Sequence, residues 1–156
     1  MNSKSTVKIL LVEDSQEDVD LIREALSHSR LEIKLSVMDN GERAMHYLHR
    51  HNGFKEVNSP DLIILDLNLP KKNGQEILVE IKKDPALKSI PVVIFTTSRS
   101  LDDISKAYGN HTNCYICKPL NLEDFTEAVN KIEDFWFHVV QLPSYLTGDN
   151  DEYKSN

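Results

Sequence analysis

The sequence has little cysteine, fewer basic than acidic residues and no long apolar run. Its 18 Lys and Arg residues against 25 Asp and Glu residues give a formal charge of −7, which disfavours sequence-independent binding to nucleic acid. Apolar runs such as residues 9–12 fall far short of a bilayer span, and the N-terminus lacks the apolar core of a signal peptide. We therefore expect a cytoplasmic protein that binds neither nucleic acid nor membrane.

The two cysteines, Cys114 and Cys117, have a C-x-x-C spacing that could indicate a redox or zinc site. The sequence Cys-Tyr-Ile-Cys is instead typical of a strand, in which residues three apart point to opposite faces. Such side chains cannot share a metal ion or close a disulfide. We interpret both residues as ordinary strand cysteines.

Short apolar runs alternate with segments of helical period along the 156 residues, which are 40% hydrophobic and enough for one domain with a core. Five strand-helix units follow from this alternation. The pattern predicts an α/β, flavodoxin-like doubly wound fold, with a five-stranded parallel sheet of order 2-1-3-4-5 and five helices. The expected strands cover about residues 7–12, 33–37, 62–65, 92–95 and 113–117.

The first expected helix has a recognisable start. Ser15 is a suitable N-cap, and Asp18 three residues later completes a capping-box pattern in which Asp replaces the usual Glu or Gln. Apolar residues at helical spacing then form one face that should be buried. These residues are Val19, Ile22, Ala25 and Leu26.

Three carboxylates should meet at one edge of the expected sheet. Glu13 and Asp14 follow the first strand, Asp66 follows the third, and the strand order reverses between these two strands. Like charges this close are costly without a cation. Oxygen ligands with no nearby His or Cys favour a hard ion, so the sequence predicts a Mg²⁺ site.

Two further side chains belong to the same edge, because Thr96 ends the fourth strand and Lys118 follows the fifth. Alone, Asp14 or Asp66 would be read as a helix cap, Thr96 as a strand residue and Lys118 as a surface lysine. Together they favour a phosphoryl site in which Asp66 forms an acyl phosphate. Mg²⁺ and Lys118 would neutralise the transferred group.

The motifs together resemble a two-component response-regulator receiver domain. They are Val-Glu-Asp at residues 12–14, Leu-Asp-Leu-Asn-Leu-Pro at 65–70 with Gly74, Phe-Thr-Thr at 95–97, and Tyr-Ile-Cys-Lys-Pro at 115–119. The resemblance implies that Asp66 accepts a phosphoryl group from a histidine kinase. It also implies that the backbone carbonyl of Asn68 joins Glu13, Asp14 and Asp66 around Mg²⁺.

The resemblance further implies a conformational switch made by Thr96 and Tyr115. Thr96 would move toward the phosphoryl oxygens, and Tyr115 would turn inward to fill the vacated space. A cis bond between Lys118 and Pro119 would aim the lysine at the site. Glu13 departs from the commoner Asp at the first acidic position, and its longer side chain would reach the metal directly or through water.

A narrower resemblance, to the small regulators of cyanobacterial phytochromes, extends to about Pro143. It is carried by residues 66–74, 90–98 and 113–115, by Phe135 with Trp136, and by Leu142 with Pro143. It implies a light-regulated, phytochrome-type histidine kinase as the phosphodonor. We expect a tail over residues 1–6, a receiver domain over 7–131, an extension over 132–147 and a frayed end over 148–156.

The last expected helix begins near Asn121 and has two apolar stripes. The first, which core packing explains, comprises Leu122, Phe125, Val129, Ile132 and Trp136. The second is displaced around the helix and comprises Phe135, Val139 and Leu142. We expect Phe135, Trp136, Val139 and Leu142 to form a homodimer contact, because monomers seldom expose large apolar patches. The alternative is packing on the same subunit's core.

These observations predict a signalling receiver rather than an enzyme. Two other functions compete with this prediction. The first is a Mg²⁺-dependent phosphatase with an aspartyl nucleophile, which is weakened because the second Asp of such enzymes is Asn68 here. The second is a non-phosphorylated binding module that keeps only the fold. The joint presence of Asp14, Asp66, Thr96 and Lys118 argues against it.

Overall fold

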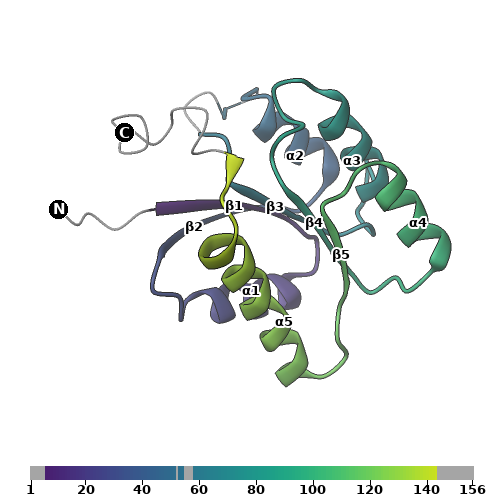
Figure 1. Cartoon of the computed structure of the whole chain (residues 1–156). Coiled ribbons are helices and arrows are strands. Elements are labelled where there is room, and N and C mark those ends of the chain that lie inside the picture. Colours follow the sequence, from purple (N-terminus) through teal and green to yellow (C-terminus); the bar gives the residue numbers. More distant parts are fainter. Residues whose placement is uncertain (1–5, 52, 55–57, 144–156) are drawn as a thin grey trace.

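The computed structural model describes residues 6–51, 53–54 and 58–143. Five parallel strands form one sheet in the order β2-β1-β3-β4-β5, which confirms the predicted topology. Figure 1 shows the sheet running through the centre of the molecule. The strands are β1 Thr6–Val12, β2 Glu32–Met38, β3 Leu62–Leu65, β4 Val92–Thr96 and β5 Cys114–Cys117.

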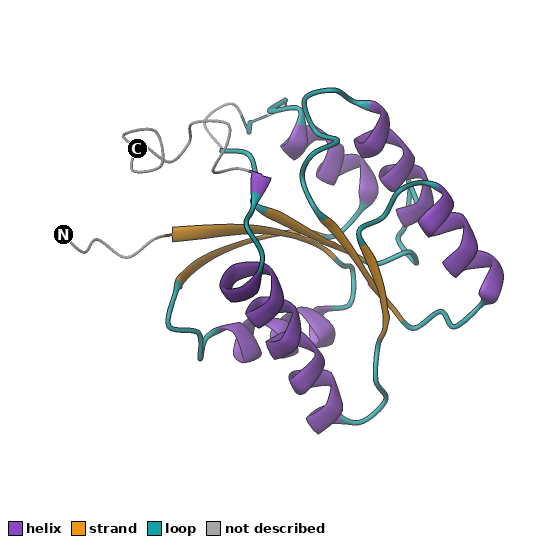
Figure 2. Cartoon of the chain, in the orientation of Figure 1, coloured by secondary structure: helices purple, strands orange, loops and turns teal. Residues whose placement is uncertain are grey.

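Helices cover both faces of the sheet. In Figure 2, α1 and α5 lie on one face, and α2, α3 and α4 lie on the other. A five-residue π-helical turn, η1, directly follows α5. The helices are α1 Gln16–Leu26, α2 Gly41–Leu48, α3 Gly74–Lys83, α4 Leu101–Gly109, α5 Leu122–Asp134 and η1 Phe135–Val139.

Polar N-caps fix where the five α-helices begin. The side chain of each cap accepts a hydrogen bond from the backbone N–H three residues later, which satisfies one of the free donors of the first turn. Each helix start, and with it the loop before it, is therefore set by local sequence. The caps are Ser15, Asn40, Asn73, Ser100 and Asn121.

The core is divided between the two faces of the sheet. Leu10 and Val12 of β1 join the cluster beneath α2 and α3, whereas Ile9 and Leu11 join the cluster beneath α1 and α5. All four residues of β3 are at most 2% exposed, which confirms a central strand covered on both sides. The apolar face predicted for α1 is likewise buried.

The end of the chain differs from the sequence-based prediction. Leu122 was expected in the core but is 60% exposed; it is the first residue of α5, and the buried face of this helix begins at Phe125. Leu142 was expected on a helical stripe, but the helical segment ends at Val139 and Leu142 is 2% exposed. Trp136 packs against the core beneath α1 and α5.

Leu142 and Trp136 therefore pack on their own subunit, the alternative that the sequence left open. Phe135 and Val139 stay 48% and 65% exposed. Residues 1–5 and 144–156, which hold most of the expected terminal tails, lie outside the described residues. Within the described part of the chain, no helix has the length and apolar character needed to cross a membrane.

Candidate functional site

The carboxyl ends of β1 and β3 bring the two buried carboxylates together. Val12 pairs with Leu65 in the parallel register, so Glu13 and Asp66 leave the two strands side by side. The Asp66 N–H donates to the Val12 carbonyl at 3.1 Å, and the Glu13 N–H donates to the Met38 carbonyl at 3.0 Å. Backbone bonds thus hold both residues at the sheet edge where the sequence placed them.

Glu13, Asp14 and Asp66 form a cluster of acidic oxygens, each offering one oxygen within 4.8 Å of the others. Glu13 and Asp66 are buried, whereas Asp14 is exposed. Three carboxylate oxygens around a partly open position match the ligands that hard divalent cations prefer. The residues present therefore fit a divalent metal ion.

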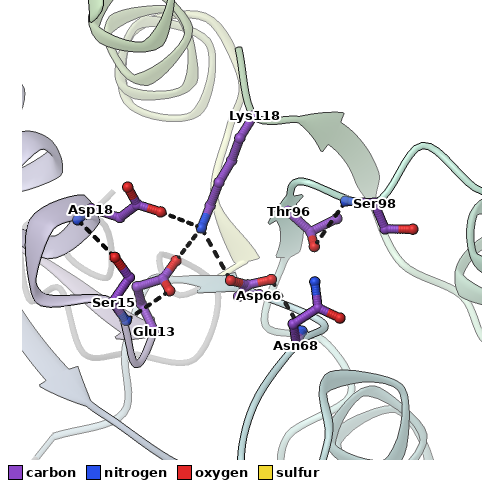
Figure 3. Close-up of polar contacts among 8 residues, drawn as sticks. All are labelled: Glu13, Ser15, Asp18, Asp66, Asn68, Thr96, Ser98 and Lys118. Atoms are coloured by element: carbon purple, nitrogen blue, oxygen red, sulfur yellow. Dashed lines mark hydrogen bonds and ion pairs between the residues drawn. The ribbon is translucent and has the colours of Figure 1, made fainter. Parts of the chain in front are cut away.

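Asn68 lies next to this cluster and is exposed. Its backbone N–H donates to Asp66 Oδ1 at 3.1 Å, which orients the carboxylate (Figure 3). The participation of the Asn68 carbonyl in metal binding remains a prediction.

Lys118 lies among the carboxylates and uses all of its donors on them. Its Nζ lies 2.6 Å from Glu13 Oε1, 2.7 Å from Asp18 Oδ2 and 3.1 Å from Asp66 Oδ2. Figure 3 shows the lysine reaching from the end of β5 to these three acceptors. The side chain is only 4% exposed, so the ammonium charge is compensated almost entirely by protein carboxylates.

The buried charges shift one another's ionisation. Burial raises the pKa of Glu13 to about 7; the Asp66 carboxylate acts in the same direction, and hydrogen bonds from Lys118 and Ser15 oppose the rise. Burial lowers the pKa of Lys118, but the hydrogen bonds to Asp18 and Glu13 outweigh it and raise that pKa above its ordinary value. Lys118 therefore stays positively charged among these carboxylates.

Lys118 reaches the site without the expected cis bond. Every peptide bond in the described residues is trans, so the prediction for Lys118 and Pro119 is wrong for this structure. A trans X-Pro bond is the ordinary state, favoured by about 0.5–1 kcal/mol. Backbone hydrogen bonds orient the residue instead: its N–H donates to the Thr96 carbonyl at 2.6 Å, and its carbonyl accepts from Arg99 at 3.3 Å.

Thr96 and Ser98 lie on the side of Asp66 away from Glu13 and Asp18 (Figure 3). Thr96 is fully buried, and its Oγ1 accepts a hydrogen bond from the Ser98 N–H at 3.4 Å. The Tyr115 hydroxyl donates to the Ser98 carbonyl at 2.9 Å. Ser98 therefore connects Thr96 and Tyr115, the two residues of the expected switch.

Sequence reasoning missed Asp18 as a site residue. The prediction of a capping box was half right: Ser15 Oγ accepts from the Asp18 N–H at 3.2 Å, but the Asp18 carboxylate turns to Lys118. The signal was present, since Asp18 lies one helical turn beyond the Glu13-Asp14 pair. It was read only as a helix cap because Lys118 is 100 residues away in the chain.

Comparisons with known proteins agree with this geometry. The family model of the response regulator receiver domain matches residues 9–130. Response regulator Rcp1 of Synechocystis sp. is 46% identical over 136 residues, which are 87% of this chain and 92% of Rcp1. The probable methanogenesis regulatory protein FilR2 of Methanothrix harundinacea is 41% identical over 128 residues, 82% of each chain.

Two solved structures extend the comparison to three dimensions. The phosphorylated cyanobacterial phytochrome response regulator RcpA is 47% identical with a TM-score of 0.88, over 89% of this chain and 99% of its own. The Mn²⁺-bound form of Rcp1 is 46% identical with a TM-score of 0.85, and the match covers 88% of this chain and 99% of the Rcp1 chain. Together with the carboxylates, threonine and lysine at the strand ends, these matches show that the chain belongs to the response regulator receiver domain family.

Proposed function

We propose that Asp66 accepts a phosphoryl group from a phytochrome-type histidine kinase and that Mg²⁺ is bound by Glu13, Asp14, Asp66 and the Asn68 carbonyl. The observation that carries the proposal is the position of Asp66, whose carboxylate lies between the Lys118 ammonium and the acidic cluster. Two relatives support it, since one is named as phosphorylated and another as Mn²⁺-bound. RcpA is named as a cyanobacterial phytochrome response regulator, and Rcp1 is named as a response regulator.

The residues of this chain account for the transfer chemistry. An Asp66 oxygen attacks phosphorus, an O–P bond forms, and the P–N bond of the phosphohistidine breaks with its electron pair returning to the imidazole nitrogen. Lys118 and Thr96 then donate to the phosphoryl oxygens, where negative charge increases. Mg²⁺, when bound, supplies further positive charge to the same oxygens.

The switch proposed for Thr96 and Tyr115 has a physical connection in Ser98. Because the Ser98 N–H holds Thr96 and the Ser98 carbonyl holds the Tyr115 hydroxyl, movement of the threonine disturbs the hydrogen bond of the tyrosine. Tyr115 packs at the edge of the core under α4. Phosphorylation of Asp66 would thus change the position of Tyr115 and, with it, the surface formed by α4 and β5. The protein would act as a signalling switch.

The homodimer remains part of the proposal. Phe135 and Val139 are exposed apolar side chains of η1, whereas Trp136 packs against the core of the same subunit and Leu142 is buried. Phe135 and Val139 would form the contact directly, and Trp136 and Leu142 would support it from within the subunit.

The direct test is phosphotransfer from a radiolabelled phytochrome-type histidine kinase in the presence of Mg²⁺. The wild-type protein should acquire an alkali-labile label, as an acyl phosphate does, and Asp66→Asn should remove it. Asp20→Asn is the matched control, because Asp20 is an exposed carboxylate on α1 whose side chain bonds Gln16. Equal labelling of the Asp66→Asn and wild-type proteins would refute the assignment.

A further inference from the structure

The Asp18 carboxylate contacts the lysine that the proposed phosphotransfer requires. Asp18 Oδ2 lies 2.7 Å from Lys118 Nζ, closer than the 3.1 Å between Nζ and Asp66 Oδ2. The Asp18 side chain is 23% exposed, whereas Lys118 is 4% exposed. A charge-assisted hydrogen bond of this length is among the stronger polar contacts in proteins.

Asp18 is free to make this contact because another carboxylate satisfies the helix N-terminus. In a complete capping box, the residue at this position accepts a hydrogen bond from the backbone N–H of the N-cap. Here the Ser15 N–H donates to Glu13 Oε2 at 3.1 Å instead. In α3, by contrast, the Glu76 carboxylate accepts from the Asn73 N–H and the box is complete. Glu13 thus replaces Asp18 in capping, and Asp18 turns toward the lysine.

Asp18 also differs from the other partners of Lys118 in its relation to the metal site. The acidic cluster that fits a cation contains Glu13, Asp14 and Asp66 but not Asp18. Lys118 has three N–H donors, and two of its three acceptors belong to that cluster. A cation and Lys118 therefore compete for Glu13 and Asp66, whereas Asp18 serves only the lysine.

We propose that Asp18 is a positioning residue that holds the Lys118 ammonium at this edge of the sheet and keeps it from neutralising the metal ligands. Without Asp18, the lysine pairs with Glu13 and Asp66 alone and opposes cation binding at the same oxygens. With Asp18, it keeps one strong anchor while Glu13 and Asp66 serve the cation. The part of this inference that concerns phosphorylation rests on the proposed function, and the part that concerns cation binding does not.

A double-mutant cycle on Mg²⁺ affinity, measured by titration calorimetry, tests the inference on the unphosphorylated protein. Asp18→Asn should weaken Mg²⁺ binding by about tenfold, because the loss of one charge-assisted hydrogen bond shifts Lys118 onto the metal ligands. In a Lys118→Met background, the same substitution should change the affinity by only about twofold, because the lysine through which Asp18 acts is gone and only the screened attraction between its charge and the cation is lost. Equal effects in both backgrounds would show that Asp18 acts through its charge alone and would overturn the proposal.

A second measurement does not need Lys118→Met. That substitution leaves buried carboxylates without their cation and could therefore destabilise the fold. The ¹⁵N signal of the Lys118 ammonium in the metal-free protein should be sharp and slow to exchange with water, because all three N–H groups are bonded. Asp18→Asn should accelerate that exchange by about tenfold. Asp20→Asn removes the same charge from the same helix and should leave the signal unchanged. An unaltered signal in Asp18→Asn would also refute the proposal.

Phosphorylation provides the third readout. At saturating Mg²⁺, Asp18→Asn should slow labelling of Asp66 by about tenfold relative to Asp20→Asn. Failure of the wild-type protein to acquire label would refute the proposed function and leave the Mg²⁺ cycle to decide the role of Asp18. Normal labelling with an additive cycle would refute the role of Asp18 and leave the proposed function intact.

Discussion

At the scale of single residues, the two oxygens of Asp66 have different partners. Oδ1 accepts from the Asn68 N–H, and Oδ2 accepts from Lys118. This difference fixes the carboxylate plane before any phosphodonor arrives, so little orientational freedom is lost in the reaction. Thr96 is already fully buried beside it. The receiver is therefore preorganised around one reactive carboxylate.

Cys114 provides a residue-scale prediction that tests the structural reading of the C-x-x-C pair. Both cysteines are free thiols, and burial raises the pKa of Cys114 to about 11 despite a hydrogen bond to Trp136. The thiolate is the reactive form, and its population at about pH 8 falls tenfold for each unit by which the pKa rises. In a Cys117→Ser protein, Cys114 should therefore react with iodoacetamide about a hundredfold more slowly than an ordinary thiol.

The control for Cys114 is the same protein unfolded in urea, where the thiol is exposed to water. Its alkylation rate should rise to that of a small free thiol at the same pH. The rate in the folded protein should grow with pH until about pH 11. A folded-state rate equal to the unfolded-state rate would show that Cys114 is a reactive thiol and would reopen the redox interpretation.

At the scale of secondary-structure elements, the sequence predicted what depends on local pattern. The buried run Leu62–Leu65 identified the central strand, and the caps Ser15 and Asn121 marked helix starts. Asp66 and Lys118 were found because each follows a strand end, and parallel strands bring such ends to one edge. Local signals and sheet topology were therefore sufficient for the fold and for the grouping of most candidate site residues at one edge of the sheet.

The parts that the sequence did not predict depend on contacts between distant segments. The carboxylate of Asp18 could accept a hydrogen bond from the N-cap of its own helix or from Lys118. Only the folded chain brings the lysine close enough for the second contact. The end of α5 passes into the π-helical turn Phe135–Val139, after which Leu142 returns to the core. A continuing apolar period does not reveal such a change, because it assumes a regular helix.

The loop between β3 and α3 yields an element-scale prediction at Gly74. A Cβ at this position would overlap the Asp66 carbonyl and would lie 2.6 Å from the Leu67 Cα, and both are backbone atoms that cannot move cheaply. Gly74→Ala should lower the free energy of unfolding by about 1–3 kcal/mol. It should also slow phosphorylation, because the displaced backbone carries Asp66. Urea denaturation and phosphotransfer measure the two effects.

Gly109 is the matched control for Gly74. It ends α4, and a Cβ there would meet nothing within 4 Å. Gly109→Ala should therefore be neutral or raise the free energy of unfolding by up to about 1 kcal/mol, since alanine favours helices. If Gly74→Ala proved as stable as Gly109→Ala, the close approach of α3 to the Asp66 backbone would be wrong.

At the scale of the whole molecule, the proposed site and the proposed dimer contact lie at opposite ends of α5. Helix α5 begins after Lys118 at the carboxyl edge of the sheet and runs back along the strands to η1 (Figure 1). Its 13 residues span about 20 Å. Phe135 and Val139 are exposed at the far end of this helix, away from Asp66. Because the proposed contact lies a helix length from the proposed phosphorylation site, we expect the dimer to form with and without the phosphoryl group.

Analytical ultracentrifugation tests this expectation with two charge substitutions at exposed apolar positions. Val139 is 65% exposed, so Val139→Lys should leave the subunit fold intact, as its melting temperature will show. In an apolar interface, a lysine must lose its hydration, which should weaken dimerisation by about a hundredfold and yield monomers at micromolar concentration. Leu101→Lys is the control, because Leu101 is 83% exposed on α4, on the other face of the sheet. A monomeric wild-type protein would refute the dimer, and monomers in Leu101→Lys but not in Val139→Lys would assign the contact to α4 instead.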